Sequence, residues 1–314
     1  MSEVVTLTMN PSVDRSCDAE RVVGERKIRC GPPRREPGGG GINVARAMSR
    51  LGEEARAVYL AGGPTGEILG GLLDQEGIRH EAVDVDDWTR ENFTVIETTT
   101  NRQFLFVMPG PTIREAEWRQ CLEALATMDE VPDYRVLSGS LPPGAPDDFY
   151  ARVATEAREA GTRVVLDTSG AALRHAVDAG VFLVKPNPRE LEQLAGRELE
   201  GEDEQEEVAR SLVEDGKAEI VLVSFGAGGA LLVTEEVEER ISSPTVPISS
   251  RVGAGDSMVA GTMCGLIRGY EPAKAARFGV ASGAAAVKTP GLELCRRADA
   301  DELFERMTGE SEEA

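Results

Sequence analysis

Lysine and histidine are scarce in this chain of 314 residues, which contains five lysines and two histidines. Acidic residues outnumber basic ones by 55 to 34, and the formal net charge at pH 7 is −21. Nucleic-acid phosphates require a basic surface, so this balance argues against a nucleic-acid partner. A lysine inside a motif is therefore informative. The lysines are Lys27, Lys185, Lys217, Lys274 and Lys288.

Cysteine pairs and long apolar runs are also missing. The five cysteines form no CxxC pair, and together with the two histidines they show no ligand spacing typical of a zinc site. We therefore expect reduced thiols. No apolar run approaches the roughly 20 residues that span a bilayer. The N-terminal segment has no basic region of the kind that begins a signal peptide. We therefore expect a cytoplasmic protein with no membrane partner.

Short apolar runs alternate with amphipathic stretches along most of the chain. "EVVTLTM" (3–9) and "RVVLDTSG" (163–170) are typical of buried strands, and "GINVARAMSRLG" (41–52) is typical of a helix. This alternation predicts an α/β fold in which a mostly parallel sheet is covered by helices on both faces.

Two stretches interrupt the alternation, at about 11–36 and 88–110. The second has a period of two with a turn at Thr100–Asn101, which predicts an antiparallel hairpin. We expect both stretches to form a small β-sheet lid beside the main sheet, at the end where α/β enzymes bind ligands. The expected organisation is one domain over 1–309, with a disordered tail over 310–314.

A run of four glycines opens "GGGGINVAR" (38–46). It could be a flexible linker, but with Asn43 in the first helical turn it favours a close approach of the backbone to a polar ligand. A dinucleotide fingerprint would need GxGxxG after the first strand with an acidic partner, and the chain lacks both, which argues against a dehydrogenase.

Two further motifs have an ordinary structural interpretation beside a functional one. In "KPNPREL" (185–191), Asn187 and Glu190 could support a hydrated Mg²⁺ through water, or Glu190 could simply stabilise a helix N-terminus. "SFGAGGALLV" (224–233) could be a hairpin with a glycine turn, or a turn that leaves room for a nucleotide.

"VGAGDSMVAG" (252–261) places a carboxylate directly after a glycine-rich turn and at the start of an apolar helix. The N–H groups of Gly253, Ala254 and Gly255 could bind the charge that develops on a phosphoryl group. Asp256 could then accept a proton from an acceptor hydroxyl. The structural alternative is that Asp256 caps the helix.

Together and in this order, the four motifs resemble the ribokinase-like (PfkB) carbohydrate kinases over essentially the whole chain. The resemblance implies a ribokinase-like fold, ATP with Mg²⁺ as cofactor, and a small sugar substrate; a monovalent cation is left open. It implies that catalysis involves Asp256, Gly253, Ala254 and Gly255. The implied nucleotide-binding residues are Lys185, Asn187, Arg189, Glu190, Ser224, Gly226, Gly228 and Gly229, with Asn187 and Glu190 near the metal through water.

Within the family, the chain resembles bacterial minor-type 6-phosphofructokinases in "TLTMNPSVD" (6–14), "DDWTREN" (86–92) and "SGSLPPG" (138–144). This implies transfer of the γ-phosphoryl group of ATP to the 1-hydroxyl of fructose 6-phosphate. Relatives that act on fructose 1-phosphate or tagatose 6-phosphate typically carry lysine where this chain has Gly40. Kinases of those two sugars and an inactive sugar-phosphate sensor remain the alternatives.

The same resemblance implies a substrate site and a homodimer formed through the lids, with some basic residues reaching across from the second subunit. The implied substrate-binding positions are Asp14, Lys27, Arg29, Gly39, Gly40, Asn43, Arg90 and position 139, a glycine in this chain. Three residues depart from the pattern: Leu105 replaces an arginine that contacts the substrate phosphate, and Arg189 and Arg251 differ near the nucleotide.

Overall fold

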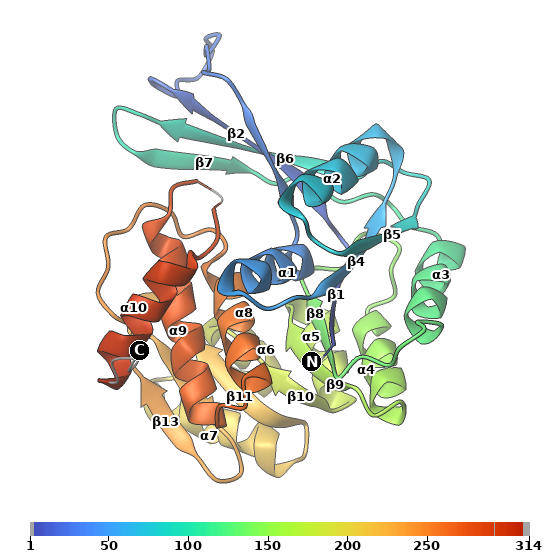
Figure 1. Ribbon diagram of the computed structural model, residues 1–314, viewed down its shortest axis with the longest axis vertical. Coiled ribbons are helices and arrows are strands. Elements are labelled where there is room, and N and C mark those ends of the chain that lie inside the picture. The colour runs from blue at the N-terminus through green and yellow to red at the C-terminus, as the bar shows by residue number, and fades with distance from the viewer. Residues whose placement is uncertain (1–2, 292, 310–314) are drawn as a thin grey trace.

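A nine-stranded sheet forms the centre of the computed structural model, which describes residues 3–291 and 293–309 (Figure 1). The predicted tail, 310–314, lies outside the described residues. The strand order is β13-β12-β11-β10-β9-β8-β1-β4-β5, and every neighbouring pair from β11 to β5 is parallel. The strands are β1 (Val4–Thr8), β4 (Arg56–Ala61), β5 (His80–Asp84), β8 (Tyr134–Ser138), β9 (Arg163–Asp167), β10 (Val181–Val184), β11 (Ala218–Ser224), β12 (Ala230–Val233) and β13 (Glu238–Ile241).

Helices cover both faces of this sheet, which confirms the predicted fold class. One core contains Ile42 of α1 and Phe278 of α9, and the other contains Phe149 of α4 and Leu191 of α6. The first layer comprises α1 (Gly40–Leu51), α2 (Gly63–Glu76), α8 (Ala254–Ile267), α9 (Pro272–Lys288) and α10 (Arg297–Thr308). The second comprises α3 (Glu115–Ala126), α4 (Phe149–Glu159), α5 (Gly170–Asp178), α6 (Pro188–Ala195) and α7 (Glu202–Glu214). Within the described ranges, no helix is both long and apolar enough to cross a membrane.

A second sheet of four strands stands beside the main one, at the top of Figure 1. Its order is β3-β2-β6-β7, from β2 (Ser12–Ala19), β3 (Arg34–Gly38), β6 (Arg90–Glu97) and β7 (Arg102–Phe106). Strands β6 and β7 form the antiparallel hairpin expected from the sequence, and Asn101 in its turn has a positive φ of 56°. The sheet is mixed because β2 and β6 run parallel.

The two faces of the small sheet differ in chemistry because side chains alternate along each strand. Cys17, Ala19 and Val95 are buried together on one face. The register places Asp14 opposite Asn92, and Leu105 opposite Thr94, on the other face. Leu105 therefore shares a face with Asp14.

The glycine run at 38–41 lets the start of α1 pack directly on the ends of two strands. A Cβ at Gly40 would lie 2.3 Å from Ser138 Oγ and 2.8 Å from the backbone nitrogen of Gly139. A Cβ at Gly41 would lie 2.5 Å from the carbonyl oxygen of Leu7. These distances leave no room for a side chain, so the run is a packing requirement and not a flexible linker.

We expect Gly40→Ala to lower the free energy of unfolding by about 2 kcal/mol or more, because the backbone of β8 must move to admit the methyl group. Gly71→Ala in α2 is the matched control. Nothing lies within 4 Å of its Cβ position, so we expect a gain of roughly 0.5–1 kcal/mol from helix propensity. Urea titration of both variants measures the difference; equal stabilities would contradict the packing argument.

Candidate active site

The four motifs meet at one edge of the main sheet. Parallel strands end at a common edge, and Thr8, Ser138, Asp167 and Ser224 are the last residues of β1, β8, β9 and β11. Lys185 directly follows β10. The glycine run packs on this edge, and α8 begins there, since Lys185 Nζ lies 3.7 Å from the Cβ position of Gly255. Segments far apart in the sequence thus contribute to one site.

The N-terminus of α8 presents unpaired backbone donors. The helix is preceded by Gly253 in the left-handed conformation, with a φ of 77°, and Asp256 is its third residue. The cap is therefore Gly253, and the alternative in which Asp256 caps the helix is wrong. Among the described residues, the N–H groups of Gly253, Ala254 and Gly255 donate to no protein acceptor. They are free to bind an anion.

Asn43 fixes the position of the Asp256 carboxylate. Asn43 Nδ2 donates to Asp256 Oδ2 at 2.9 Å across 213 residues of sequence. The almost fully buried Arg46 donates to Asn43 Oδ1 at 3.4 Å and to the carbonyl oxygen of Pro37 at 3.0 Å. It also forms an ion pair with Glu76 at 2.6 Å. Arg46 thereby orients the amide so that its NH₂ group faces Asp256.

A buried ion pair lies beside Asp256. Lys185 Nζ is 3.1 Å from Asp167 Oδ1, and both side chains are largely buried. Burial opposes the lysine charge, but Asp167, Glu190 and Asp256 together raise the pKa of Lys185 above its ordinary value. Lys185 is therefore a permanent cation at this edge of the sheet.

The surroundings of Asp256 raise the pKa of its carboxyl group to about 6. Burial contributes most and the nearby charge of Asp167 adds to it, while the Asn43 hydrogen bond and Lys185 act in the opposite direction. A carboxylate with this pKa is ionised at neutral pH and is a stronger base than an exposed aspartate.

Asn187 and Glu190 cap α6 reciprocally. Asn187 Oδ1 accepts from the N–H of Glu190 at 3.0 Å, and Glu190 Oε2 accepts from the N–H of Asn187 at 2.8 Å. Burial raises the pKa of Glu190 and Asp167 adds to this effect. Glu190 therefore stabilises the N-terminus of α6, as the structural interpretation of the motif predicts. Its second carboxylate oxygen, Oε1, stays available to a water molecule.

Several residues that the sequence predicts near the nucleotide lie in or beside the turn that joins β11 and β12. Ser224 N donates to the carbonyl oxygen of Pro186 at 2.9 Å, which ties the end of β11 to the KPNPREL loop. The predicted glycine turn is a short 3₁₀ segment, Gly226–Gly228, followed by Gly229, whose Cβ would lie 1.9 Å from the carbonyl oxygen of Ile241.

Arg189 and Arg251 are exposed and have no ion-pair partner among residues 3–291 and 293–309.

Asp14 and Arg90 lie at the base of the small sheet. Asp14 Oδ1 accepts from Ser12 Oγ at 2.7 Å and from Asn92 Nδ2 at 2.8 Å. The Arg90 guanidinium donates to the carbonyl oxygens of Asn10 and Met108 at 2.9 and 3.0 Å. Burial lowers the pKa of Arg90, and Asp14 acts in the opposite direction. Arg90 thus links the segments before β2 and after β7, next to Asp14. Its guanidinium has further N–H groups that can donate to a ligand.

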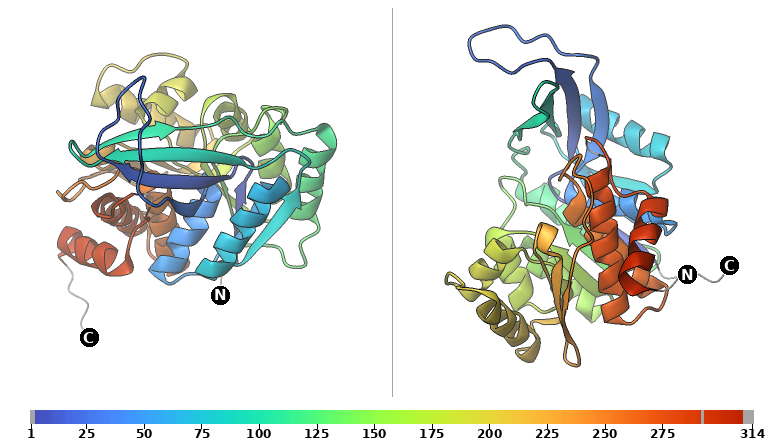
Figure 2. Two further views of the ribbon diagram at one scale, coloured as in Figure 1. Left: turned by 90° about the horizontal axis from the view of Figure 1, so that it is seen from above. Right: turned by 90° about the vertical axis from the view of Figure 1, so that its left-hand side faces the viewer.

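The chain does not bring Lys27 and Arg29 to this edge. Both lie in the exposed loop over 20–33, which projects from the small sheet away from the main body (Figure 2). Gly139, by contrast, is packed into the site: its N–H donates to the carbonyl oxygen of Asp167 at 2.9 Å, and its φ is 101°. Gly40 lies beside it, and Gly39 packs on Thr8 and Pro11.

Comparison with known proteins decides the family. A profile of pfkB family carbohydrate kinases matches residues 3–299. The chain belongs to the pfkB family of carbohydrate kinases. It is 45% identical over 302 residues to "ATP-dependent 6-phosphofructokinase isozyme 2" of Mycobacterium tuberculosis, with 96% of this chain and 89% of the relative covered. It is 36% identical to a 1-phosphofructokinase of Bacillus subtilis, with 90% and 91% covered.

The solved structures agree with this family. Phosphofructokinase-2 of Escherichia coli in complex with potassium superposes with a TM-score of 0.95 and is 40% identical, covering 98% of this chain and 100% of that chain. The match extends over both sheets, so the kinase has the fold of this family, including the small sheet.

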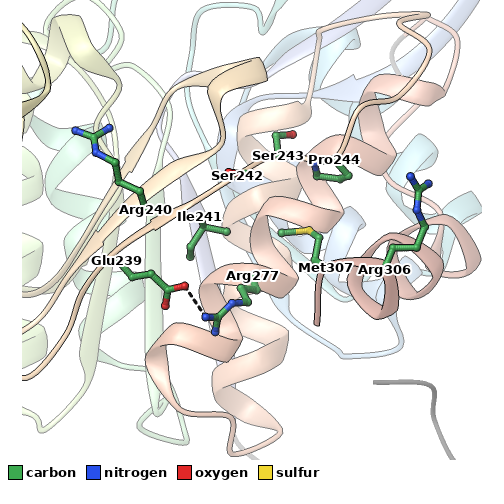
Figure 3. Close-up of a pocket in the computed structure, with 9 residues that line it drawn as sticks. All are labelled: Glu239, Arg240, Ile241, Ser242, Ser243, Pro244, Arg277, Arg306 and Met307. Atoms are coloured by element: carbon green, nitrogen blue, oxygen red, sulfur yellow. Dashed lines mark hydrogen bonds and ion pairs between the residues drawn. The ribbon is translucent and has the colours of Figure 1, made fainter. Parts of the chain in front are cut away.

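A cavity of about 500 Å³ lies away from these residues, between β13, α9 and α10 (Figure 3). Arg277 and Glu239 form an ion pair at 2.5 Å on its wall. None of the residues singled out in the sequence is among its lining residues, which are Glu239, Arg240, Ile241, Ser242, Ser243, Pro244, Arg277, Arg306 and Met307. Most of the residues predicted from the sequence thus gather at the sheet edge and not in this cavity.

The raised pKa of Asp256 predicts how activity and stability depend on pH. The sequence predicts Asp256 as the catalytic base, and a base must be ionised to accept a proton, so we expect kcat to fall about tenfold for each pH unit below about 6, as measured in steady-state assays. The pKa of Asp256 is higher in the folded protein than in the unfolded chain. The folded protein therefore loses stability as the pH rises through about 6 and Asp256 ionises. At pH 8, Asp256→Asn should therefore unfold at higher urea concentration, with a gain of roughly 1–2 kcal/mol. Asp129→Asn, at an exposed position, is the control. An acid limb near pH 4 would contradict the assignment.

Proposed function

We propose that this kinase transfers the γ-phosphoryl group of ATP to the 1-hydroxyl of fructose 6-phosphate. The observation that carries the proposal is the Asp256 carboxylate, held by Asn43 at 2.9 Å beside the unpaired N–H groups at the start of α8. The name of the Mycobacterium tuberculosis relative supports the substrate, and a structure of the Escherichia coli enzyme contains fructose 6-phosphate.

In this mechanism, Asp256 accepts the proton of the 1-hydroxyl as its oxygen attacks the γ-phosphorus. The N–H groups of Gly253, Ala254 and Gly255 donate to the equatorial phosphoryl oxygens, whose charge is stabilised by the positive end of the α8 dipole. Phosphoryl transfer depends mainly on such positioning and electrostatic stabilisation. Lys185 adds a fixed positive charge beside the same oxygens.

Mg²⁺ would enter with the nucleotide. Among the described residues, no group of three or more His, Cys, Asp and Glu side chains could hold a metal directly, so a protein cage is not available to it. Mg²⁺ keeps several waters and binds phosphates. Asn187 and Glu190, together with the neighbouring Asp167 carboxylate, suit hydrogen bonds to those waters. The ion would neutralise charge on the phosphates during transfer. A monovalent cation is part of the proposal because the Escherichia coli structure contains potassium.

The remaining assignments follow the family pattern. Asp14 and Asn43 bind sugar hydroxyls, together with the backbone at 39, 40 and 139. Arg90 binds the substrate phosphate. Lys27 and Arg29, which lie away from the site of their own chain, bind the phosphate in the second subunit of a homodimer. Ser224, Gly226, Gly228, Gly229 and Arg189 surround the nucleotide.

The assembly is also part of the proposal. The exposed apolar side chains of Leu105, Phe106, Val107 and Met108 on and after edge strand β7 favour a homodimer through the small sheets. Residues 1–309 then act as one cytoplasmic kinase domain with the small sheet as lid. One Escherichia coli structure is described as a tetrameric inhibited form, so a larger assembly is a second arrangement to test by light scattering.

A coupled assay of ADP formation against three sugar phosphates tests the substrate. We expect the highest kcat/KM for fructose 6-phosphate, and lower values for tagatose 6-phosphate and fructose 1-phosphate. A preference for fructose 1-phosphate would favour the activity of the Bacillus subtilis relative, and binding without turnover would favour a sensor. Asp256→Asn controls for contaminating kinases, since its kcat should be lower by roughly 10²–10⁴ with similar substrate binding.

Lys27→Ala and Arg29→Ala should each weaken fructose 6-phosphate binding by about 1.5–3 kcal/mol, because a charge-assisted hydrogen bond is lost. ATP binding should change little. Calorimetric titration measures both ligands, and Arg21→Ala in the same loop is the control. An equal loss for both ligands would mean that the loop is destabilised and that these residues do not bind the phosphate.

Leu105→Arg should strengthen fructose 6-phosphate binding by about 1–3 kcal/mol, the range for a hydrogen bond to a charged group. Leu105 is 51% exposed and shares a face with Asp14, so an arginine there can reach the substrate side. Val131→Arg places the same charge at an exposed position away from the small sheet and should change affinity little. Equal affinities of Leu105→Arg and the parent enzyme would show that another cation already fills this place.

A further inference from the structure

Two cysteines lie on neighbouring chain segments at the base of the loop over 20–33. Cys17 lies on β2 and is 2% exposed. Cys30 is exposed and lies near the C-terminal end of the loop, where the chain returns to β2. Cys30 is the antiparallel partner of Ala19, and the N–H of Gly31 donates to the carbonyl oxygen of Asp18 at 2.8 Å. Cys17 and Ala19 share one face of β2, so Cys30 lies on the same face as Cys17 and diagonally across from it.

Cys30 is therefore a near neighbour of Cys17 across the two chain segments. The exposure of Cys30 distinguishes this pair from Cys121, Cys264 and Cys295, which are buried in the main cores. Burial, together with the neighbouring Cys30, raises the pKa of the Cys17 thiol to about 11. Cys17 is thus a shielded thiol, and the exposed Cys30 is the one that an oxidant in solution reaches first.

The loop between the two cysteines is weakly held. Its residues are exposed over 23–30, and near its start the N–H of Val22 donates to Glu97 Oε1 at 2.9 Å. Lys27 and Arg29 lie in this exposed part, and Arg29 directly precedes Cys30. A covalent bond at Cys30 would therefore restrain both basic side chains.

We propose that Cys17 and Cys30 form a reversible intrachain disulfide that clamps this loop and makes sugar-phosphate binding redox-sensitive. A low-molecular-weight disulfide, RSSR, is the oxidant. The Cys30 thiolate attacks one sulfur of RSSR and releases RS⁻; the Cys17 thiolate then attacks Sγ of Cys30 and releases a second RS⁻. Two cysteine thiols are oxidised, one RSSR is reduced to two RSH, and the thiol protons pass to the two RS⁻ groups.

The clamp holds the loop on the face of the small sheet that carries Cys17, opposite the face that carries Asp14. Lys27 and Arg29 then have less freedom to approach a sugar phosphate. The kinetic consequence rests on the proposed function of these two residues, whereas formation of the disulfide does not.

Peptide mapping and kinetics together test the proposal. The protein is incubated with glutathione disulfide, alkylated and digested with trypsin without reduction. Trypsin cleaves inside the loop, so the disulfide is expected as a linked pair of peptides, 16–21 with 30–34, which dithiothreitol separates. In the same sample, KM for fructose 6-phosphate should rise about tenfold, the effect of losing one charge-assisted hydrogen bond, and should return on reduction.

Cys30→Ser and Cys17→Ala should lack the linked peptides and keep the reduced KM after oxidation, while Cys121→Ala should behave as the parent enzyme does. Absence of the linked peptides, or a Cys30–Cys30 bond between chains, would overturn the disulfide. Linked peptides with an unchanged KM would overturn the redox control. Loss of all kinase activity in the reduced protein would instead be a failure of the proposed function, and the peptide map would still report the disulfide.

Discussion

The Asp256 carboxylate must be withdrawn from water and yet remain ionised at neutral pH. Burial and the charge of Asp167 favour its protonated form, and the Asn43 hydrogen bond and Lys185 favour the ionised form. The resulting pKa of about 6 lies between that of an exposed aspartate and that of a fully desolvated one. Each neighbour is itself fixed, since Lys185 is paired with Asp167 and Asn43 is held by Arg46.

This balance depends on close packing of the backbone. Asn43 and Asp256 are 213 residues apart, and the contact of α1 with β1 and β8 brings them together. Gly40 and Gly41 permit that contact because a side chain at either position would overlap with the strand ends. The same edge of the sheet collects Asp167 and Lys185 because β9 and β10 are parallel neighbours. The site is thus a consequence of parallel topology combined with a glycine-lined helix start.

Much of this arrangement was predictable from the sequence. The alternation of apolar runs and helices predicts the α/β fold, the period-two segment over 88–110 predicts the β6–β7 hairpin, and the glycine-rich turn before Asp256 predicts unpaired donors at a helix start. Local pattern determines these features. The resemblance to known kinases supplied the roles proposed for Asp14 and Lys185, which no local pattern reveals.

The features that the sequence did not reveal depend on tertiary contacts. Asp167 ends a strand and has no motif of its own, so only the strand order places it beside Lys185. Arg46 carries a weak signal, a charge three residues after Asn43 on an apolar helix face. The cap of α8 was ambiguous because a glycine and an aspartate both suit that position, and the left-handed φ of Gly253 decides between them. The proximity of Cys17 to Cys30 arises only from the folded loop.

The most direct test of the account is to identify the product. Phosphorus NMR of a reaction with ATP, Mg²⁺ and fructose 6-phosphate should show loss of the γ-phosphate signal and growth of one new phosphomonoester signal coupled to the protons on C1 of the sugar. Asp256→Asn should show neither change on the same timescale. Inorganic phosphate as the main product, or a new ester at another carbon, would contradict a base placed to deprotonate the 1-hydroxyl.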